Sequence, residues 1–350
     1  MRPKHFSYWD AGHECPVSQG LRSAPGKHSV ESSLEDWLPL TQTSLDGQRR
    51  ALNRSSPTVL RYHAERDGSI NMPDPVTRHL VTSDNQRLHF RHWAAAKECR
   101  GVIVALHGVQ SHSGWYTWSS RQLAAAGYDV YFADRRGSGL NGIRRGHADH
   151  GLRLLNDVRQ LIWFARREHA DPSLPLTLMS VSWGGKIASA LAATWPNEIS
   201  QLALLYPGLI PLLQPTRSQT RRLKLGRHFD VRFKGVDLPL TDPQLFTAVP
   251  EHQKFIAEDP LALHRVTSGF LNAGRDLDDI VQARCRQIVH PTLLMLAGQD
   301  QIIDNVATSQ LVARFASKRQ TTIRYPDAQH TLEFEPDREQ FVSDLIDWLG

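Results

Sequence analysis

The feature that most constrains this fold is a sharp turn between a strand-like and a helix-like segment. Apolar residues 174–179 precede the sequence Ser180-Val181-Ser182-Trp183-Gly184-Gly185, and small helix-forming residues follow it up to Ala193. A strand that turns abruptly into a helix lifts the serine at its centre above the edge of a sheet, an arrangement called a nucleophile elbow. The turn strains the serine backbone and requires small neighbours, which Gly184 and Gly185 provide.

Two serines in this turn compete for the role of nucleophile. Ser182 has Ser180 and Gly184 at its flanking positions, whereas Ser180 would have Leu178 and Ser182 there, a poorer fit. Ser180 also replaces the glycine that usually opens the motif. A serine before a helix is by itself equally typical of a helix N-cap, so the assignment of Ser182 depends on the residues that accompany it.

Strands and helices alternate through most of the chain. The pattern predicts a hairpin over 77–93, a fully apolar strand at 101–106, a helix near 116–125, a strand at 128–133, a helix at 151–169 and a strand at 199–206. Such alternation predicts an α/β fold, a doubly wound and mostly parallel sheet with an antiparallel start.

The alternation breaks between about residues 208 and 279, where no clear strand is found and prolines and charges are common. It resumes with a strand at 292–297, a helix at 305–317, a strand at 321–325 and a helix at 338–349. We interpret 208–279 as an inserted, mainly helical lid over the strand ends, where α/β enzymes place their sites.

Residues 1–74 differ from the rest of the 350-residue chain. They are rich in Ser, Pro, Arg and Gln and lack periodicity, so we expect a poorly ordered or loosely packed extension before a single domain at 75–350. The start has no apolar signal-peptide core, and no apolar run reaches the roughly 18 residues of a membrane span.

The net charge and the cysteine content limit which partners and which cellular compartment we expect. Cys15, Cys99 and Cys285 are odd in number and far apart, which favours a reducing, cytoplasmic location without disulfides. A net charge of +5 is mild for this length and indicates no nucleic-acid partner.

A serine nucleophile needs an imidazole base that a carboxylate orients. Asp300 follows the predicted strand at 292–297, and His330 follows the strand at 321–325, so both lie at the carboxyl edge of the sheet with Ser182. The chain order Ser, Asp, His is that of a nucleophile-elbow hydrolase. Asp304 and Asp279 are the alternative acids, but Asp304 is better placed to cap a helix and no strand leads into Asp279.

Acyl transfer also needs donors for the oxyanion. His107-Gly108-Val109 follows the central strand, and Gly108 allows a close approach to the nucleophile. We expect the backbone amides of Val109 and Trp183 to form the oxyanion hole and His107 to brace the loop. This chemistry requires neither a metal nor an organic cofactor.

With these residues in place, the chain from about 76 to 350 resembles an α/β-hydrolase of the monoacylglycerol lipase and lysophospholipase-like branch, often grouped with serine aminopeptidase-type domains. The resemblance rests on four segments: 107–116 (HGVQSHSGWY), 134–147 (DRRGSG followed by RRGH), 259–267 (DPL followed by VT) and 291–349 with Asp300 and His330. Ser180 in place of glycine and the extension before residue 75 depart from that pattern.

The resemblance implies a serine hydrolase that cleaves carboxylic esters through an acyl-enzyme on Ser182, with a monoacylglycerol, a lysophospholipid or a small ester as substrate. An acyltransferase, a thioesterase or a peptidase could use the same triad, and a catalytically silent binding protein is a further alternative. Apolar residues of the insertion would line an acyl channel. Its basic run would meet a lipid phosphate or an anionic membrane surface in transient contact, or would simply be solvated: Arg217, Arg221, Arg222, Lys224, Arg227, Arg232 and Lys234.

Overall fold

The structure of this protein is a computed structural model that describes residues 74–212 and 233–350. The predicted extension, apart from Asp74, lies outside the described residues. So does the basic run of the insertion, apart from Lys234.

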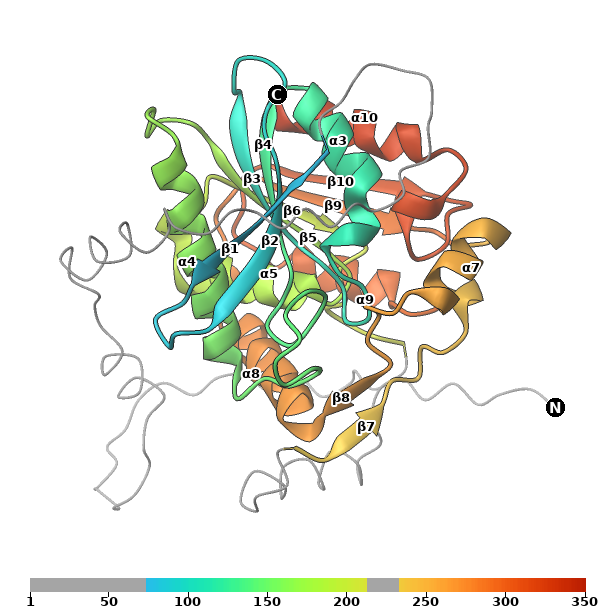
Figure 1. The fold of residues 1–350 in the computed structure, drawn as a ribbon. Helices are drawn as coiled ribbons and strands as arrows, with labels where there is room; N and C mark the ends of the chain where they lie inside the picture. Colours follow the sequence, from blue (N-terminus) through green and yellow to red (C-terminus); the bar gives the residue numbers. More distant parts are fainter. Residues whose placement is uncertain (1–73, 213–232) are drawn as a thin grey trace, which may run out of the picture. The chain divides into compact units, whose positions relative to one another are not determined.

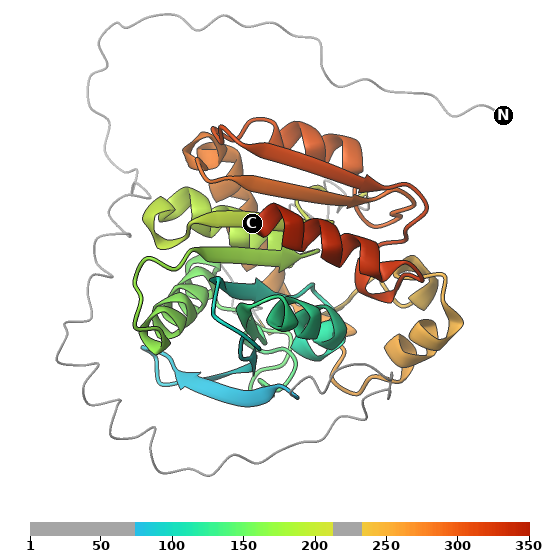
Figure 2. The same cartoon turned by 90° about the horizontal axis from the view of Figure 1, so that it is seen from above.

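An eight-stranded sheet forms the centre of the described fold, in the order β1-β2-β4-β3-β5-β6-β9-β10 (Figure 1). Seen from above, the strands follow one another from the blue N-terminal pair to the orange-red C-terminal pair (Figure 2). β1 pairs antiparallel with β2 and β2 antiparallel with β4, while all later neighbours are parallel. The predicted mostly parallel sheet with an antiparallel start is therefore confirmed. The strands are β1 (Val76–Val81), β2 (Arg87–Trp93), β3 (Gly101–Leu106), β4 (Tyr128–Ala133), β5 (Leu176–Val181), β6 (Gln201–Leu205), β9 (Thr292–Ala297) and β10 (Gln320–Tyr325).

The central strands are buried on both faces, which explains why their sequences are apolar throughout. In β3, Val102 and Val104 contribute to one hydrophobic core, whereas Ile103 and Ala105 contribute to the other. Side chains alternate between the two faces of a strand, so each core receives every second residue.

Helices cover both faces of the sheet. The core that contains Val102 also receives residues of α4 (Gly151–Glu168), α5 (Gly184–Thr194) and α8 (Ser268–Arg284) and of the segment around α9 (Asn305–Val312). The other core receives residues of α3 (Thr117–Ala125) and α10 (Arg338–Leu349). The described residues also form short 3-10 helices: η2 (Ser113–Tyr116), η3 (Pro196–Glu198), η4 (Pro243–Leu245), η5 (Cys285–Gln287) and η6 (Leu332–Phe334).

The segment between β6 and β9 differs from the prediction. It contains β7 (Gly235–Asp237) and β8 (Arg265–Thr267), which pair antiparallel, and the helix α7 (Pro250–Glu258) before α8. The expectation of no strand in 208–279 is wrong because strands of three residues are too short to show an alternating pattern. The helix α8 also continues past the predicted boundary, to Arg284.

Among the described residues, no helix is both long and apolar enough to span a bilayer. Cys99 and Cys285 are free thiols.

Candidate active site

Ser182 lies in the turn between β5 and α5, with a backbone φ of 47°, in the left-handed region that non-glycine residues rarely occupy. The turn is held by its own backbone. The Ser182 amide donates to the Leu205 carbonyl at 3.1 Å, and the Ser182 carbonyl accepts from Gly185 at 2.9 Å and from Gly208 at 2.6 Å. The surrounding hydrogen bonds thus maintain the strained conformation that the sequence predicts for an elbow.

Close packing explains the small residues of the turn. A Cβ atom on Gly184 would lie 2.9 Å from the Leu106 carbonyl oxygen and 2.8 Å from that of His107, so a larger residue would displace β3 or β5. Ser180, the alternative nucleophile, is fully buried within β5. Its hydroxyl cannot meet a substrate from that position.

His330 lies between Ser182 and Asp300. Its Nε2 atom is 2.9 Å from the Ser182 hydroxyl oxygen, and its Nδ1 atom is 2.8 Å from an Asp300 carboxylate oxygen. A carboxylate only accepts hydrogen bonds, so Nδ1 carries the proton and Nε2 is left to accept the serine proton. The three side chains that the sequence singles out, 148 and 30 residues apart, are thus joined in one hydrogen-bonded chain.

The carboxylate and the imidazole are both fixed by their surroundings. The second carboxylate oxygen of Asp300 accepts from the amides of Ile302 at 2.8 Å and Ile303 at 3.0 Å. The rings of Tyr206 and Phe246 meet His330 edge to face, with centroids 5.1 and 5.9 Å away. These contacts leave the imidazole little freedom to rotate away from the serine.

The two alternative acids have other positions. Asp304 accepts from the Ala307 amide at 2.9 Å and caps α9, as expected of a helix N-cap. Asp279 is exposed on α8. Asp300 is the acid that lies beside His330.

The two amides predicted for the oxyanion hole belong to Trp183, the residue after the serine, and to Val109, which lines the same pocket as the serine. Val109 follows Gly108, whose Cα is packed so closely that a Cβ there would lie 3.2 Å from the Ser182 Cβ. Trp183 is the N-cap of α5, where the helix dipole favours negative charge. Within the described part of the chain, neither amide donates a hydrogen bond to another protein atom.

A small pocket opens onto these groups. It brings Val109, Ser182 and His330 together with Phe246, one of the apolar residues of the insertion that the sequence predicts to line an acyl channel. It also includes residues that the sequence does not single out as pocket residues, namely Tyr116, Tyr206, Leu240 and Ile302. Tyr206 directly follows β6 at the same sheet edge as Ser182, which is the signal that could have identified it.

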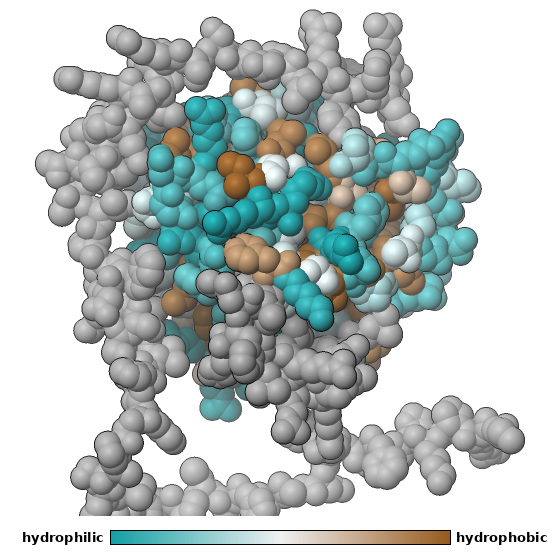
Figure 3. Space-filling model, turned by 60° about the horizontal axis from the view of Figure 1, so that its bottom comes forward, coloured by the Kyte–Doolittle hydropathy of each residue, from teal (hydrophilic) through white to brown (hydrophobic). Residues whose placement is uncertain are grey.

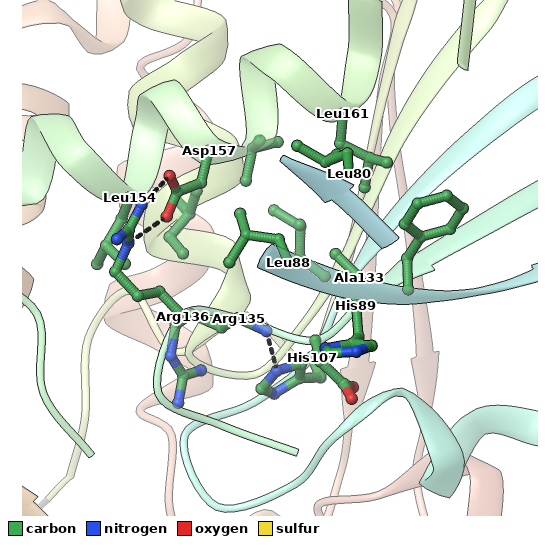
Figure 4. Close-up of a pocket in the computed structure, with 15 residues that line it drawn as sticks. Leu80, Leu88, His89, His107, Ala133, Arg135, Arg136, Leu154, Asp157 and Leu161 are labelled. Atoms are coloured by element: carbon green, nitrogen blue, oxygen red, sulfur yellow. Dashed lines mark hydrogen bonds and ion pairs between the residues drawn. The ribbon is translucent and has the colours of Figure 1, made fainter. Parts of the chain in front are cut away.

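A second pocket lies between the sheet and α4 (Figure 4). Its lining is largely apolar, with a polar side formed by His107, Arg135, Arg136 and Asp157. Since neither Ser182 nor His330 reaches it, this pocket is not part of the candidate site.

Figure 3 brings forward the side of the molecule that carries β7, β8 and α8 in Figure 1. Hydrophobic residues appear there in several separate places among hydrophilic ones. Phe233 and Val236 are 54% and 36% exposed, and Lys234 lies exposed between them.

Comparisons with known proteins agree with this fold. The family described as serine aminopeptidase, S33, matches residues 97–337, and the chain belongs to it. A monoacylglycerol lipase of Mycolicibacterium smegmatis is 28% identical over 270 residues, covering 75% of this chain and 92% of the relative. The crystal structure of Paleococcus ferrophilus monoacylglycerol lipase (25% identity) has a TM-score of 0.65 and covers 75% of this chain and 98% of that one. A soluble monoglyceride lipase variant from Saccharomyces cerevisiae (19% identity) has a TM-score of 0.71, covering 82% and 98%. The predicted α/β-hydrolase fold and hydrolase class are confirmed.

Proposed function

We propose that this member of the serine aminopeptidase S33 family cleaves a monoacylglycerol or a lysophospholipid-type ester through an acyl-enzyme on Ser182. The chain is a carboxylic-ester hydrolase by its family and its lipase relatives. The acyl-enzyme mechanism is supported above all by the hydrogen bonds that join Ser182 to His330 and His330 to Asp300. Ser182 and His330 also line a pocket that can receive the ester.

In the proposed reaction, His330 Nε2 takes the Ser182 hydroxyl proton as the serine oxygen attacks the ester carbonyl. Asp300 holds the ring in the required tautomer and stabilises the imidazolium that forms. The carbonyl oxygen becomes an oxyanion, and the amides of Val109 and Trp183 donate to it. His330 then protonates the leaving alcohol, and water repeats the sequence on the acyl-enzyme.

The substrate class is supported by the apolar part of the pocket and by the relatives. Leu240, Phe246 and Ile302 offer hydrocarbon surface to an acyl chain next to the serine. The relatives named above are two monoacylglycerol lipases and a monoglyceride lipase.

Transient contact with a membrane surface belongs to the same proposal. Phe233 and Val236 are exposed beside Lys234, a combination suited to an interface with anionic lipid. Co-sedimentation with anionic vesicles, compared with the double variant Phe233→Ser, Val236→Ser, tests it, and equal binding by both proteins would refute this contact.

The test is a p-nitrophenyl ester series of increasing chain length, followed by 1-monooleoylglycerol, with alanine p-nitroanilide as the peptidase control. The wild type should hydrolyse the esters and not the anilide. Ser182→Ala should reduce kcat by about 10⁴-fold or more and abolish fluorophosphonate labelling. Hydrolysis of the anilide alone would favour the peptidase alternative, and full activity in Ser182→Ala would refute the mechanism.

The acid is tested by two matched variants. Asp300→Asn should reduce kcat by about 10³–10⁴-fold because the asparagine favours the wrong imidazole tautomer. Asp304→Asn should leave kcat unchanged, since asparagine caps a helix as well as aspartate does. The reverse result would show that the acid is misassigned.

A further inference from the structure

A buried arginine lies directly behind the loop that carries the Val109 amide. The Arg135 side chain donates from Nη1 to the Gly108 carbonyl at 2.8 Å and from Nη2 to the Val109 carbonyl at 3.0 Å. The residue is 8% exposed. Arginine presents its donors in a rigid planar fork, so two adjacent carbonyls fix its position and it fixes theirs.

His107 also binds the Gly108 carbonyl. Its Nε2 atom accepts from the Arg135 backbone amide at 2.8 Å, the bond drawn in Figure 4. The proton therefore lies on Nδ1, which donates to the Gly108 carbonyl at 2.7 Å. Burial, together with the charge of Arg135, lowers the pKa of His107 to about 3, so the ring stays neutral and keeps this tautomer.

The Gly108 carbonyl and the Val109 amide belong to one planar peptide unit, in which C=O and N–H point in opposite directions. Arg135 and His107 bind the oxygen, so the N–H must point away from them. Val109 and Ser182 line the same pocket, and no protein atom among the described residues accepts from this N–H. A cation at the carbonyl oxygen also polarises the peptide and makes its N–H a stronger donor.

The same guanidinium contacts the residue that carries the second amide. Its central carbon lies 5.0 Å from the centre of the Trp183 indole and 4.9 Å from that of the Phe270 ring. The two rings are stacked at 4.6 Å. Arg135, Trp183 and Phe270, a residue of α8, thus form one cluster in which each group contacts the other two.

We propose that Arg135 is a positioning residue of the oxyanion hole, which sets the direction and donor strength of the Val109 amide and holds Trp183 in place. The inference rests on the proposed function of Ser182. Arg135 touches no reacting atom and acts through two backbone amides.

The electrostatics of the position support this role. The ion pairs among the described residues do not include Arg135, so its burial is offset by carbonyls and aromatic rings rather than by a carboxylate contact. Its neighbour Arg136 has the opposite arrangement, with bonds to the Asp157 carboxylate in Figure 4. Burial lowers the pKa of Arg135 to about 9, which leaves it charged at neutral pH. A buried cation of this kind costs stability, which is the expected mark of a functional group.

The experiment compares Arg135→Met and Arg135→Lys with the control Arg159→Met in the full-length protein. Arg159 also packs against two aromatic rings, those of Trp163 and Trp195 at 4.5 and 4.6 Å, but on α4 away from the serine. Fluorophosphonate labelling carried to completion counts the folded sites, and kcat is expressed per labelled site. Two ligands are then measured, an alkyl trifluoromethyl ketone that forms an oxyanion on Ser182 and a glycerol monoalkyl ether that does not.

Arg135→Met should lower kcat by about 10- to 100-fold per labelled site, less than the loss of a whole oxyanion donor. It should lower the affinity for the ketone by the same factor and leave the affinity for the ether unchanged. Arg135→Lys should lower kcat less than Arg135→Met, because lysine keeps the positive charge, but it should not reach the wild-type kcat, because lysine reaches only one of the two carbonyls. Arg159→Met should match the wild type.

The inference would be overturned if Arg135→Met had the wild-type kcat per labelled site, or if it lost affinity for the ketone and for the ether equally. Arg135 would then have only a structural role. If the wild type itself neither hydrolyses esters nor labels at Ser182, the proposed function fails instead. The two failures are therefore distinguishable.

Discussion

At the scale of single residues, burial shifts the pKa of ionisable side chains in this fold. Glu333 is an example close to the site but outside the hydrogen-bonded chain. It is 2% exposed, and one of its carboxylate oxygens accepts from the Ser119 amide at 3.0 Å. The other has no partner among the described residues. Burial raises the pKa of this carboxyl group to about 7 from an ordinary 4.5.

This shift predicts a pH-dependent stability. Between pH 4.5 and 7 the folded protein binds the Glu333 proton more tightly than the unfolded chain, so Glu333 destabilises the fold progressively as the pH rises. Its effect on the free energy of unfolding has a slope of at most about 1.4 kcal/mol per pH unit. Glu333→Gln keeps an acceptor for Ser119 and should be more stable than the wild type at pH 8, with the difference falling toward pH 5. Urea unfolding at both values measures it, and a difference independent of pH would contradict the shift.

At the scale of elements, the segment between β6 and β9 is tied to the rest of the domain through buried hydrogen bonds. Asp259 accepts from His112 Nε2 at 3.0 Å and from the Trp115 indole at 2.6 Å. His112 and Trp115 belong to the loop and turn after β3, so one carboxylate joins the insertion to the loop that carries Val109, a residue of the proposed oxyanion hole. Burial alone would raise the pKa of Asp259, but its bonds to His112 and Trp115 lower it.

Two carboxylates of the insertion should therefore differ greatly in their contributions to stability. Asp259→Leu leaves two buried donors unpaired and should reduce the free energy of unfolding by at least about 2 kcal/mol. Asp237→Leu breaks an exposed pair with Arg265, whose side chains are 77% and 66% exposed, and should cost about 0–1 kcal/mol. Urea midpoints with unchanged m-values measure both. Equal losses would show that Asp259 does not anchor the insertion.

At the scale of the whole molecule, every residue in the proposed mechanism lies within the domain predicted for 75–350. Asp74 contributes an exposed ion pair with Arg121, with side chains 81% and 20% exposed. We propose that residues 1–74 are not required for folding or catalysis.

A protein comprising residues 75–350 tests this proposal. It should keep the wild-type kcat and lose no more than about 2–4 °C in Tm, because an exposed pair contributes at most about 1 kcal/mol. Ester hydrolysis and thermal unfolding of the two proteins measure the outcome. A loss of soluble, active enzyme would show that the extension belongs to the folded domain.

Much of the fold is determined by patterns that are local in the sequence. The strands β4 and β9 and the helix α10 begin and end where apolar periodicity predicts, because each pattern fits a single geometry. β5 lies two residues later than the predicted 174–179, because the apolar run that predicts it begins before Pro175, whereas the strand begins after it. The helix predicted at 305–317 ends at Val312. Ser182, Asp300 and His330 could be singled out because the carboxyl ends of parallel strands meet at one edge.

Only the tertiary structure decided which side chains from distant segments come into contact. No local pattern in Asp134-Arg135-Arg136 distinguishes the arginine that holds the Gly108 carbonyl from its neighbour, which pairs with Asp157. The partners lie 27 and 21 residues away along the chain, and the packing of α4, α5 and α8 on the sheet determines which of them each guanidinium meets. The sequence determined the elements and the chemistry at their ends, whereas the contacts that tune that chemistry depend on how the elements pack.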